Sequence, residues 1–441
     1  MITINGKQLP IPSFFMISNL GGGASDKYRE VVYMDLYKNI PTLFNYYYLT
    51  RPDFATKWLK HLPDYDSMAK FIKYVRQDMI NTDKYISKSH SPSDVDYESI
   101  VYLLDSGAAN IINKFDKNAS IEQVKEHLLK ELINYYDFAH RYKFDLIVGL
   151  DIGGKYTFKG EERHTQEIID RNTQIKKQND EINSMLLEAS IKYLTAHKDY
   201  YPKVLATVHG DTPKEFREYT EKILALEKEY NYKFWGFALG GVANAKGKDK
   251  SWFKSMPEGM SANTFLTAEA AKIVKKTAGN RYIHVLGGGG KDNIPLISSQ
   301  GAASFDTFTP GRRAYDGNDA STKLVFNKDA DEHFSKYLIG KYDINLKPIN
   351  KDWDFDYYPL NKINDDIDLC GCPACQCIKA FGEIKKLYSL RREEDNEDYY
   401  YARQLCNAHS IWQHVRLCEI ASRKKFLNYC LTFSLLIISF L

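Results

Sequence analysis

A cluster of thiols towards the C-terminal end of the chain has the spacing of a metal site. Cys370, Cys372 and Cys375 follow one another as C-x-C-x-x-C, and His409 lies in a later helical stretch, residues 399–421. Three thiolates at this spacing can surround one soft cation, and an imidazole can complete a tetrahedron, which is the ligand set of structural zinc. The sequence therefore predicts a structural Zn²⁺ site formed by these four residues.

Other residues near this cluster leave alternatives open. Cys377 repeats the short spacing from Cys375, while Cys406 and His414 share the helical stretch of His409 and could be ligands or ordinary packing residues. All seven cysteines lie between residues 370 and 430. Such clustering favours metal binding in a reducing compartment over a secreted disulfide framework, so we expect a cytoplasmic protein.

A second set of polar residues follows short apolar runs. Asp105 follows the run at 100–104, Asp151 follows the run at 144–150, and Asp306 follows the run at 303–305. Carboxylates brought together can serve as nucleophile, as general acid–base, or as hydrogen-bond acceptors for a planar base. Any one of them alone could instead form a turn or cap a helix.

Three further apolar runs end at His209, Gly240 and Gly287. Runs of this kind are typical of strands buried on both faces of a parallel sheet. Amphipathic stretches lie between them, among them 212–230 and 267–277, for which Thr212 and Thr267 are the expected N-caps. The alternation predicts an α/β fold of the (β/α)₈ TIM-barrel type, whose active-site face is formed by the carboxyl ends of the strands.

The glycine runs have two interpretations. Gly240-Gly241 and Gly287-Gly288-Gly289-Gly290 would let the backbone approach a flat ligand closely, or they could be tight turns. The second run could also cradle a phosphate before a helix that starts near Asn293.

We expect a barrel domain with three C-terminal parts. The predicted parts are the barrel over 1–325 with a charged helical insertion at about 155–200, a polar connector over 326–368, a zinc-binding subdomain over 369–422, and an apolar tail over 423–441. The uncharged part of the tail is short for a bilayer span, which needs about 20 residues, so we expect a packed helix or a disordered tail rather than a membrane anchor.

Composition sets broad limits on function. Apolar residues make up 44 % of the 441-residue chain, enough for a sizeable core, and the net charge is only +3. Nucleic-acid binding would therefore depend on local basic groups rather than on overall charge. The N-terminal residues lack a charged segment followed by an apolar run, so no secretory signal is expected.

The order of these motifs resembles that of the tRNA-guanine transglycosylase superfamily, the queuine and archaeosine enzymes. The resemblance rests on Asp105-Ser106-Gly107, Asp151, the run from Leu239 to Ala243, the segment from Phe305 to Arg313, and the Cys/His cluster. Residues 10–16 also look like the first strand of that family. The similarity covers about 8–320 and 368–420, and its most specific parts are the Phe-Asp-x-x-x-Pro-x-Arg segment and the zinc motif.

The resemblance implies a role for each matching residue. Asp306 would attack C1′ of the nucleoside, expel guanine and hold the sugar covalently until a 7-deazaguanine base displaces it. Asp105 would bind the base and manage its protons, and Asp151 would recognise the Watson–Crick edge of the purine. The remaining base contacts would come from Ser106, His209, Gly240, Gly241 and Leu286.

The chain departs from the family pattern in the expected base pocket. His209-Gly210 stands where the family has Gln-Gly, Ala109 replaces the usual stacking aromatic residue, and Asn244-Ala245 replaces the acid that selects an aminomethyl base. A roomier pocket without that acid favours an uncharged, preQ0-like 7-deazaguanine.

The polymer is expected to be DNA. No archaeal-type RNA-binding module is evident after the zinc motif, and the divergent pocket looks more like the phage and genomic-island branch of the superfamily, which modifies DNA guanine. The target guanine would have to leave the stack, which costs roughly a few kcal/mol. Arg312, Arg313 and the lysines of 246–254 are the expected phosphate contacts, although the lysines could simply be a solvated loop.

Other functions remain open at this point. A tRNA-guanine transglycosylase would use the same mechanism, and a non-catalytic partner subunit is disfavoured because Asp306 and Asp105 are both present. An unrelated zinc-stabilised barrel hydrolase would not need the Phe-Asp-x-x-x-Pro-x-Arg segment. The resemblance also implies that a homodimer could form.

Overall fold

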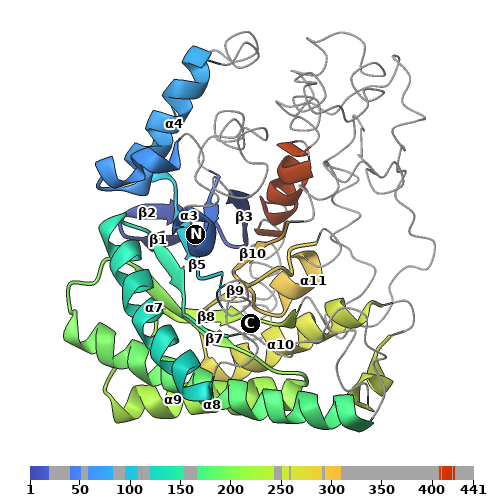
Figure 1. The fold of residues 1–441 in the computed structure, drawn as a ribbon. Coiled ribbons are helices and arrows are strands. Elements are labelled where there is room, and N and C mark those ends of the chain that lie inside the picture. The colour runs from blue at the N-terminus through green and yellow to red at the C-terminus, as the bar shows by residue number, and fades with distance from the viewer. Residues whose placement is uncertain are drawn as a thin grey trace, which may run out of the picture.

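The computed structural model shows a barrel of parallel strands surrounded by helices (Figure 1). It describes residues 1–18, 40–50, 58–82, 95–107, 111, 120–152, 166–242, 251–257, 260–290, 294–308, 407–408, 410–419 and 421–422.

The barrel closes in the order β10-β3-β4-β5-β6-β7-β8-β9, with every neighbouring pair parallel. Its strands are β3 (Ser13–Ser18), β4 (Thr42–Asn45), β5 (Tyr102–Asp105), β6 (Leu146–Val148), β7 (Lys203–Val208), β8 (Gly236–Leu239), β9 (Tyr282–Val285) and β10 (Ser304–Asp306). The α/β class and the closed eight-stranded barrel are thus confirmed.

Helices form a layer around the strands. The described helices are α3 (Tyr46–Thr50), α4 (Met68–Thr82), α7 (Ile121–Arg141), α8 (Gln166–Ala196), α9 (Pro213–Glu229), α10 (Ala262–Ala278) and α11 (Ile294–Ser299), with 3-10 turns η2 (Leu59–Asp64), η3 (Tyr97–Ser99) and η5 (Ser251–Ser255). Consecutive helices from α7 to α11 contact one another, so they cover the outside of β5 to β10 as a continuous layer (Figure 1).

One expected helix start is confirmed and one is wrong. Thr212 caps α9, since its side chain accepts a hydrogen bond from the Glu215 amide. Thr267, by contrast, lies inside α10, where its hydroxyl donates to the carbonyl of Asn263. The N-cap of α10 is Ser261, whose side chain accepts a hydrogen bond from the Thr264 amide, and the apolar residues Phe265 and Leu266 already precede Thr267 in the helix.

Strand β4 and a hairpin before the barrel were not predicted. β4 lies next to the Tyr-rich start of α3, which hides its short apolar run. The hairpin pairs β1 (Ile2–Ile4) with β2 (Lys7–Leu9) in antiparallel fashion. Asn5 and Gly6 connect them with φ values of 48° and 85°, the positive-φ pair that a two-residue hairpin turn requires.

Strand alternation divides the core into two layers. Leu43, Leu103 and Leu205 belong to the cluster inside the barrel, whereas their neighbours Phe44 and Leu104 belong to the cluster between strands and helices. Because successive side chains point to opposite faces of a strand, residues two apart share a face. This parity directs Asp105 and Asp306, at the last positions of β5 and β10, towards the barrel axis.

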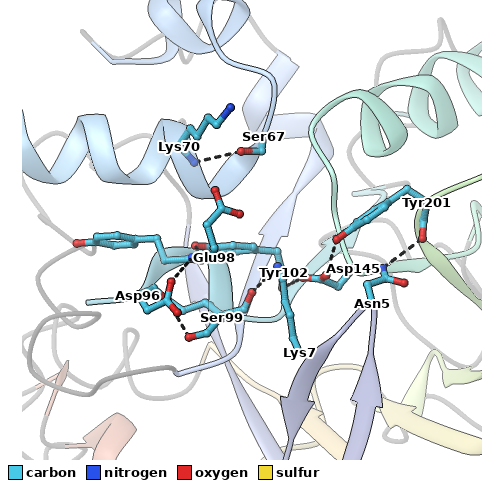
Figure 2. A network of polar contacts seen from close by, with 12 residues as sticks. Asn5, Lys7, Ser67, Lys70, Asp96, Glu98, Ser99, Tyr102, Asp145 and Tyr201 are labelled. Atoms are coloured by element: carbon cyan, nitrogen blue, oxygen red, sulfur yellow. Dashed lines mark hydrogen bonds and ion pairs between the residues drawn. The ribbon is translucent and has the colours of Figure 1, made fainter. Parts of the chain in front are cut away.

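The hairpin closes the amino-terminal end of the barrel through a buried ion pair (Figure 2). Lys7 Nζ lies 2.8 Å from Asp145 Oδ2 and donates to the carbonyl of Ile100. The same carboxylate oxygen accepts the Tyr102 amide at 2.8 Å, which joins the starts of β5 and β6. Burial raises the pKa of Asp145, and Lys7 opposes that shift.

The C-terminal helical residues pack on the barrel wall. Residues 407–408, 410–419 and 421–422 are helical, and the ring of His414 lies 4.8 Å from that of Phe14 on β3. His414, Leu417 and Cys418 are buried there. This is the packing role left open above for His414. In the part of the chain that the structure describes, we find no helix with the length and apolarity needed to cross a membrane.

Candidate active site

Four of the predicted polar residues lie at the carboxyl ends of the barrel strands. Asp105 and Asp306 end β5 and β10, Asp151 follows β6, and His209 follows β7 directly. Asp105 is close enough to both other carboxylates for their charges to alter its pKa, and Asp151 contacts His209. The structure therefore brings these four side chains together at one mouth of the barrel.

Asp105 is in an environment suited to proton transfer. Burial raises its pKa to about 7, and the negative charges of Asp306 and Asp151 contribute to the rise, while the amides of Gly107 and Ser106 oppose it. Asn45 on β4 donates to Asp105 Oδ2 at 2.9 Å. A carboxyl that changes protonation near neutral pH can give a proton and take one back within a catalytic cycle.

The backbone around Asp105 is held on both sides. The Tyr135 hydroxyl of α7 lies 2.8 Å from the carbonyl oxygens of both Leu104 and Val148, which joins β5 to β6 just below the mouth. Gly107 has a φ of 66°, and a Cβ there would lie 2.3 Å from Asn45 Oδ1. Glycine is therefore required for Asn45 to reach the carboxylate.

Asp306 is buried and held through one oxygen. Its Oδ1 lies 3.1 Å from the Gly287 amide, which donates to it, and 3.1 Å from His284 Nε2. Its backbone carbonyl accepts the Gly289 amide at 2.9 Å, and a Cβ on Gly289 would lie 2.8 Å from that carbonyl. The Gly287 and Gly289 amides thus bind Asp306, which disfavours the phosphate-cradle interpretation of this glycine run.

His209 and Asp151 act as a pair. The distance from His209 Nε2 to Asp151 Oδ2 is 2.5 Å, and both side chains are mostly buried. This short contact is not accompanied by a well-oriented hydrogen bond, since neither ring nitrogen of His209 has a hydrogen-bond partner among the described residues. Tyr219 of α9 presents an edge-on ring at 6.1 Å from the imidazole.

The remaining predicted base contacts border the same mouth. Gly240 follows β8 and is buried, Gly241 has a φ of 71°, and the Leu286 amide donates to the carbonyl of Leu239. Leu286 is partly buried against the apolar interior of the barrel. Ser106 is buried beside Asp105.

Three polar residues of the site were missed: Asn45, His284 and Ser304. His284 and Ser304 lie inside short strands whose other residues are apolar or aromatic. The available signal was their spacing, because His284 lies two residues before Leu286 and Ser304 two residues before Asp306. That both side chains point inward follows only once the strands are known to form a closed barrel, in which alternate residues face the interior.

Several predicted residues lie outside the described part of the chain. They are the zinc candidates Cys370, Cys372, Cys375, Cys377, Cys406 and His409, the phosphate candidates Lys246, Lys248, Lys250, Arg312 and Arg313, and the pocket positions Ala109, Asn244 and Ala245. The predicted connector over 326–368 and the predicted apolar tail over 423–441 also lie outside it. Among the residues described, no three His, Cys, Asp or Glu side chains lie close enough to hold a metal ion.

A cavity of about 690 Å³ lies at the opposite end of the barrel. Its lining includes Ile2 of β1, Lys203 at the start of β7 and Arg281 before β9, and none of the three mouth carboxylates. The residues suited to chemistry are therefore separate from this cavity.

Comparison with known proteins adds no relative. No protein-family model matches the chain, and no curated protein matches it in sequence.

Proposed function

We propose that this protein is a transglycosylase that exchanges guanine in DNA for a 7-deazaguanine base of the preQ0 type. The observation that carries the proposal is the pairing of two unlike carboxyl groups at one barrel mouth. Asp306 has one oxygen bound by two donors, whereas burial and neighbouring charge raise the pKa of Asp105 to about 7. Carboxyl groups with such different environments suit a nucleophile and an acid–base partner.

In the first step, Asp306 attacks C1′ of the target nucleoside. The bond between C1′ and the guanine nitrogen breaks, and its electron pair leaves with the base. Protonated Asp105 gives its proton to the departing guanine and becomes a carboxylate. The sugar remains joined to Asp306 as a glycosyl ester, so one difficult exchange becomes two easier displacements.

The second step reverses the first with another base. The ring nitrogen of the 7-deazaguanine attacks C1′ and expels the Asp306 carboxylate, and its proton passes to Asp105. Both carboxyl groups then return to their starting protonation states. Two displacements at C1′ retain the configuration of the glycosidic bond.

Base recognition is assigned to the paired His209 and Asp151. Asp151 would accept hydrogen bonds from the Watson–Crick edge of the purine, and His209 contacts its Oδ2. Gly240, directly after β8, has no Cβ and so leaves room for the His209 ring beside its backbone.

Phosphate contacts are assigned to three basic residues, one on η5 and two that follow Asp306 in the chain. Lys254 is exposed on η5, and that turn is held near the loop after His209, because Trp252 Nε1 donates to the carbonyl of Asp211 at 3.2 Å. Arg312 and Arg313 follow Asp306 in the chain and are the other candidates. Such contacts position a nucleic acid without reading its sequence.

We also propose that Cys370, Cys372, Cys375 and His409 bind Zn²⁺ in a structural role. The proposal is supported by the C-x-C-x-x-C spacing and by the helical conformation of the chain on both sides of His409.

The experiment is to incubate the protein with preQ0 and either duplex DNA or tRNA, and to analyse the nucleosides by mass spectrometry. Asp306→Ala serves as the inactive control. A deazaguanine deoxynucleoside from DNA is the expected product. Product from tRNA alone would move the protein to the RNA branch, and absence of product from both would overturn the proposal.

A further inference from the structure

A chain of hydrogen bonds runs from Asp306 into the barrel interior. His284 Nε2 lies 3.1 Å from Asp306 Oδ1, and His284 Nδ1 lies 2.7 Å from Ser304 Oγ. The Tyr282 hydroxyl donates to the same Ser304 oxygen at 2.5 Å. His284 and Ser304 are fully buried, so the chain lies within the barrel.

The order of donors fixes the tautomer of His284. Ser304 accepts from Tyr282 and therefore has its own hydroxyl proton to donate, and His284 Nδ1 is the acceptor within reach. The other ring nitrogen must then carry the hydrogen, which points at a carboxylate. Burial raises the pKa of Tyr282 and keeps its phenol protonated as the first donor.

The consequence for Asp306 is geometric. Its Oδ1 accepts both from His284 and from the Gly287 amide. Two donors on one oxygen restrain rotation about the Cβ–Cγ bond and leave Oδ2 as the oxygen that is not held by them. A reacting group held in a near-attack position contributes directly to rate, and a small misplacement can cost about 10²-fold.

We propose that His284 is a positioning residue, which Tyr282 and Ser304 hold as the Nε2–H tautomer so that Asp306 attacks through Oδ2. This inference rests on the proposed function, in which Asp306 is the nucleophile. His284 acts through Asp306 and does not itself contact the sugar.

The kinetic test compares two substitutions at one position. His284→Leu removes the donor, and we expect kcat to fall about 10²-fold while KM for the base changes less than about threefold, as for an interaction that acts in the transition state. His284→Gln retains an N–H of similar reach and should recover at least about tenfold of that loss. Equal activity of the two variants, or wild-type kcat in His284→Leu, would overturn the proposal.

Controls address packing. Ile283→Val alters the same strand on its outward face and should leave kcat unchanged. Ser304→Ala is a smaller change that breaks the hydrogen-bond chain one bond further from Asp306. Its kcat should lie between those of wild type and His284→Leu. If His284→Leu folds poorly, a kcat of Ser304→Ala below that of wild type is still expected. Wild-type kcat in Ser304→Ala would contradict a role for the chain.

A spectroscopic test is independent of activity. In protein labelled with ¹⁵N-histidine, the His284 Nε2 signal should be that of a protonated nitrogen and the Nδ1 signal that of an unprotonated acceptor, and Ser304→Ala should weaken this preference. The opposite tautomer would overturn the inference whatever the enzyme does. If this pattern is found but no base exchange occurs in DNA or tRNA, it is the proposed function that fails.

Discussion

The imidazole of His209 lies directly against the backbone of Gly240. A Cβ at position 240 would lie 2.5 Å from His209 Cε1 and 2.8 Å from Nδ1, while the opposite nitrogen of the ring lies 2.5 Å from Asp151 Oδ2. The ring is thus held between a glycine on one side and a carboxylate on the other. The small size of Gly240 therefore allows His209 to lie beside Asp151, the pair to which the proposed function assigns base recognition.

Gly240→Ala should therefore displace His209 from Asp151. We expect KM for the incoming base to rise about tenfold with a smaller change in kcat, because the substitution weakens binding of the base in the ground state. Steady-state kinetics with varied base concentration would measure this.

A double-mutant cycle provides the control. In a His209→Ala background the added methyl has no ring to displace, so Gly240→Ala should have little further effect. Fully additive losses would show that Gly240 acts independently of His209.

The pH dependence of the exchange should report Asp105. Its pKa is raised to about 7 and the first step needs the protonated form, so kcat/KM should fall as pH rises above about 7. Asp151→Asn removes one of the charges that raise this pKa, so the alkaline limb should move to lower pH. The control is Asp137, a carboxylate on α7 that accepts a hydrogen bond from the Tyr193 hydroxyl. Asp137→Asn should leave the alkaline limb of the pH profile in place. An alkaline limb that does not move in Asp151→Asn would contradict the coupling.

The same shift predicts a change in stability. The pKa of Asp105 is raised in the folded state, so this carboxyl contributes to folding stability when it is protonated. The contribution is complete below the pKa of the unfolded chain, which is near 4, and is lost as pH rises through about 7. Asp105→Asn should therefore gain stability relative to wild type between pH 5 and 8, by on the order of 1–3 kcal/mol. Urea denaturation across this range would measure the difference, and a constant difference would argue against the raised pKa.

The sequence predicted the barrel well where strands ended in polar residues. Asp105 after β5 and His209 after β7 were located because an apolar run stops abruptly at each. β4 was missed because its four residues run directly into the aromatic residues of α3. His284 was missed because it lies inside a strand, and its role depends on β10 lying alongside β9, a pairing that the sequence does not encode locally.

The ion pair beneath the barrel should matter for stability rather than for catalysis. Lys7→Met would leave Asp145 buried without its cation, which costs about 3–5 kcal/mol at neutral pH. The loss should shrink as the solution becomes more acidic, because Asp145 then protonates. Chemical denaturation of the full chain would measure it.

Restoring neutrality gives the matched control. Lys7→Met combined with Asp145→Asn removes the uncompensated charge and should recover part of the loss, while kcat stays near the wild-type value in both variants. If Lys7→Met alone is as stable as wild type, the ion pair is not needed to close the barrel.

Removal of one proposed zinc ligand should lower both zinc content and stability. Structural zinc contributes its binding free energy to folding, so Cys372→Ser should unfold at a lower temperature and contain less than one zinc per chain. Cys430→Ser, outside the proposed set, is the control. Full zinc content in Cys372→Ser would shift the ligand set towards Cys377.

The central claim is that Asp306 forms a covalent bond to the sugar. The most direct measurement is to incubate the protein with labelled duplex DNA without an incoming base, denature it, and map the adduct by peptide mass spectrometry. The account predicts a glycosyl adduct on Asp306 that preQ0 releases and that Asp306→Ala does not form. With tRNA as the polymer, the same adduct would preserve the mechanism and change the substrate. An adduct on another residue, or base exchange by Asp306→Ala, would contradict it.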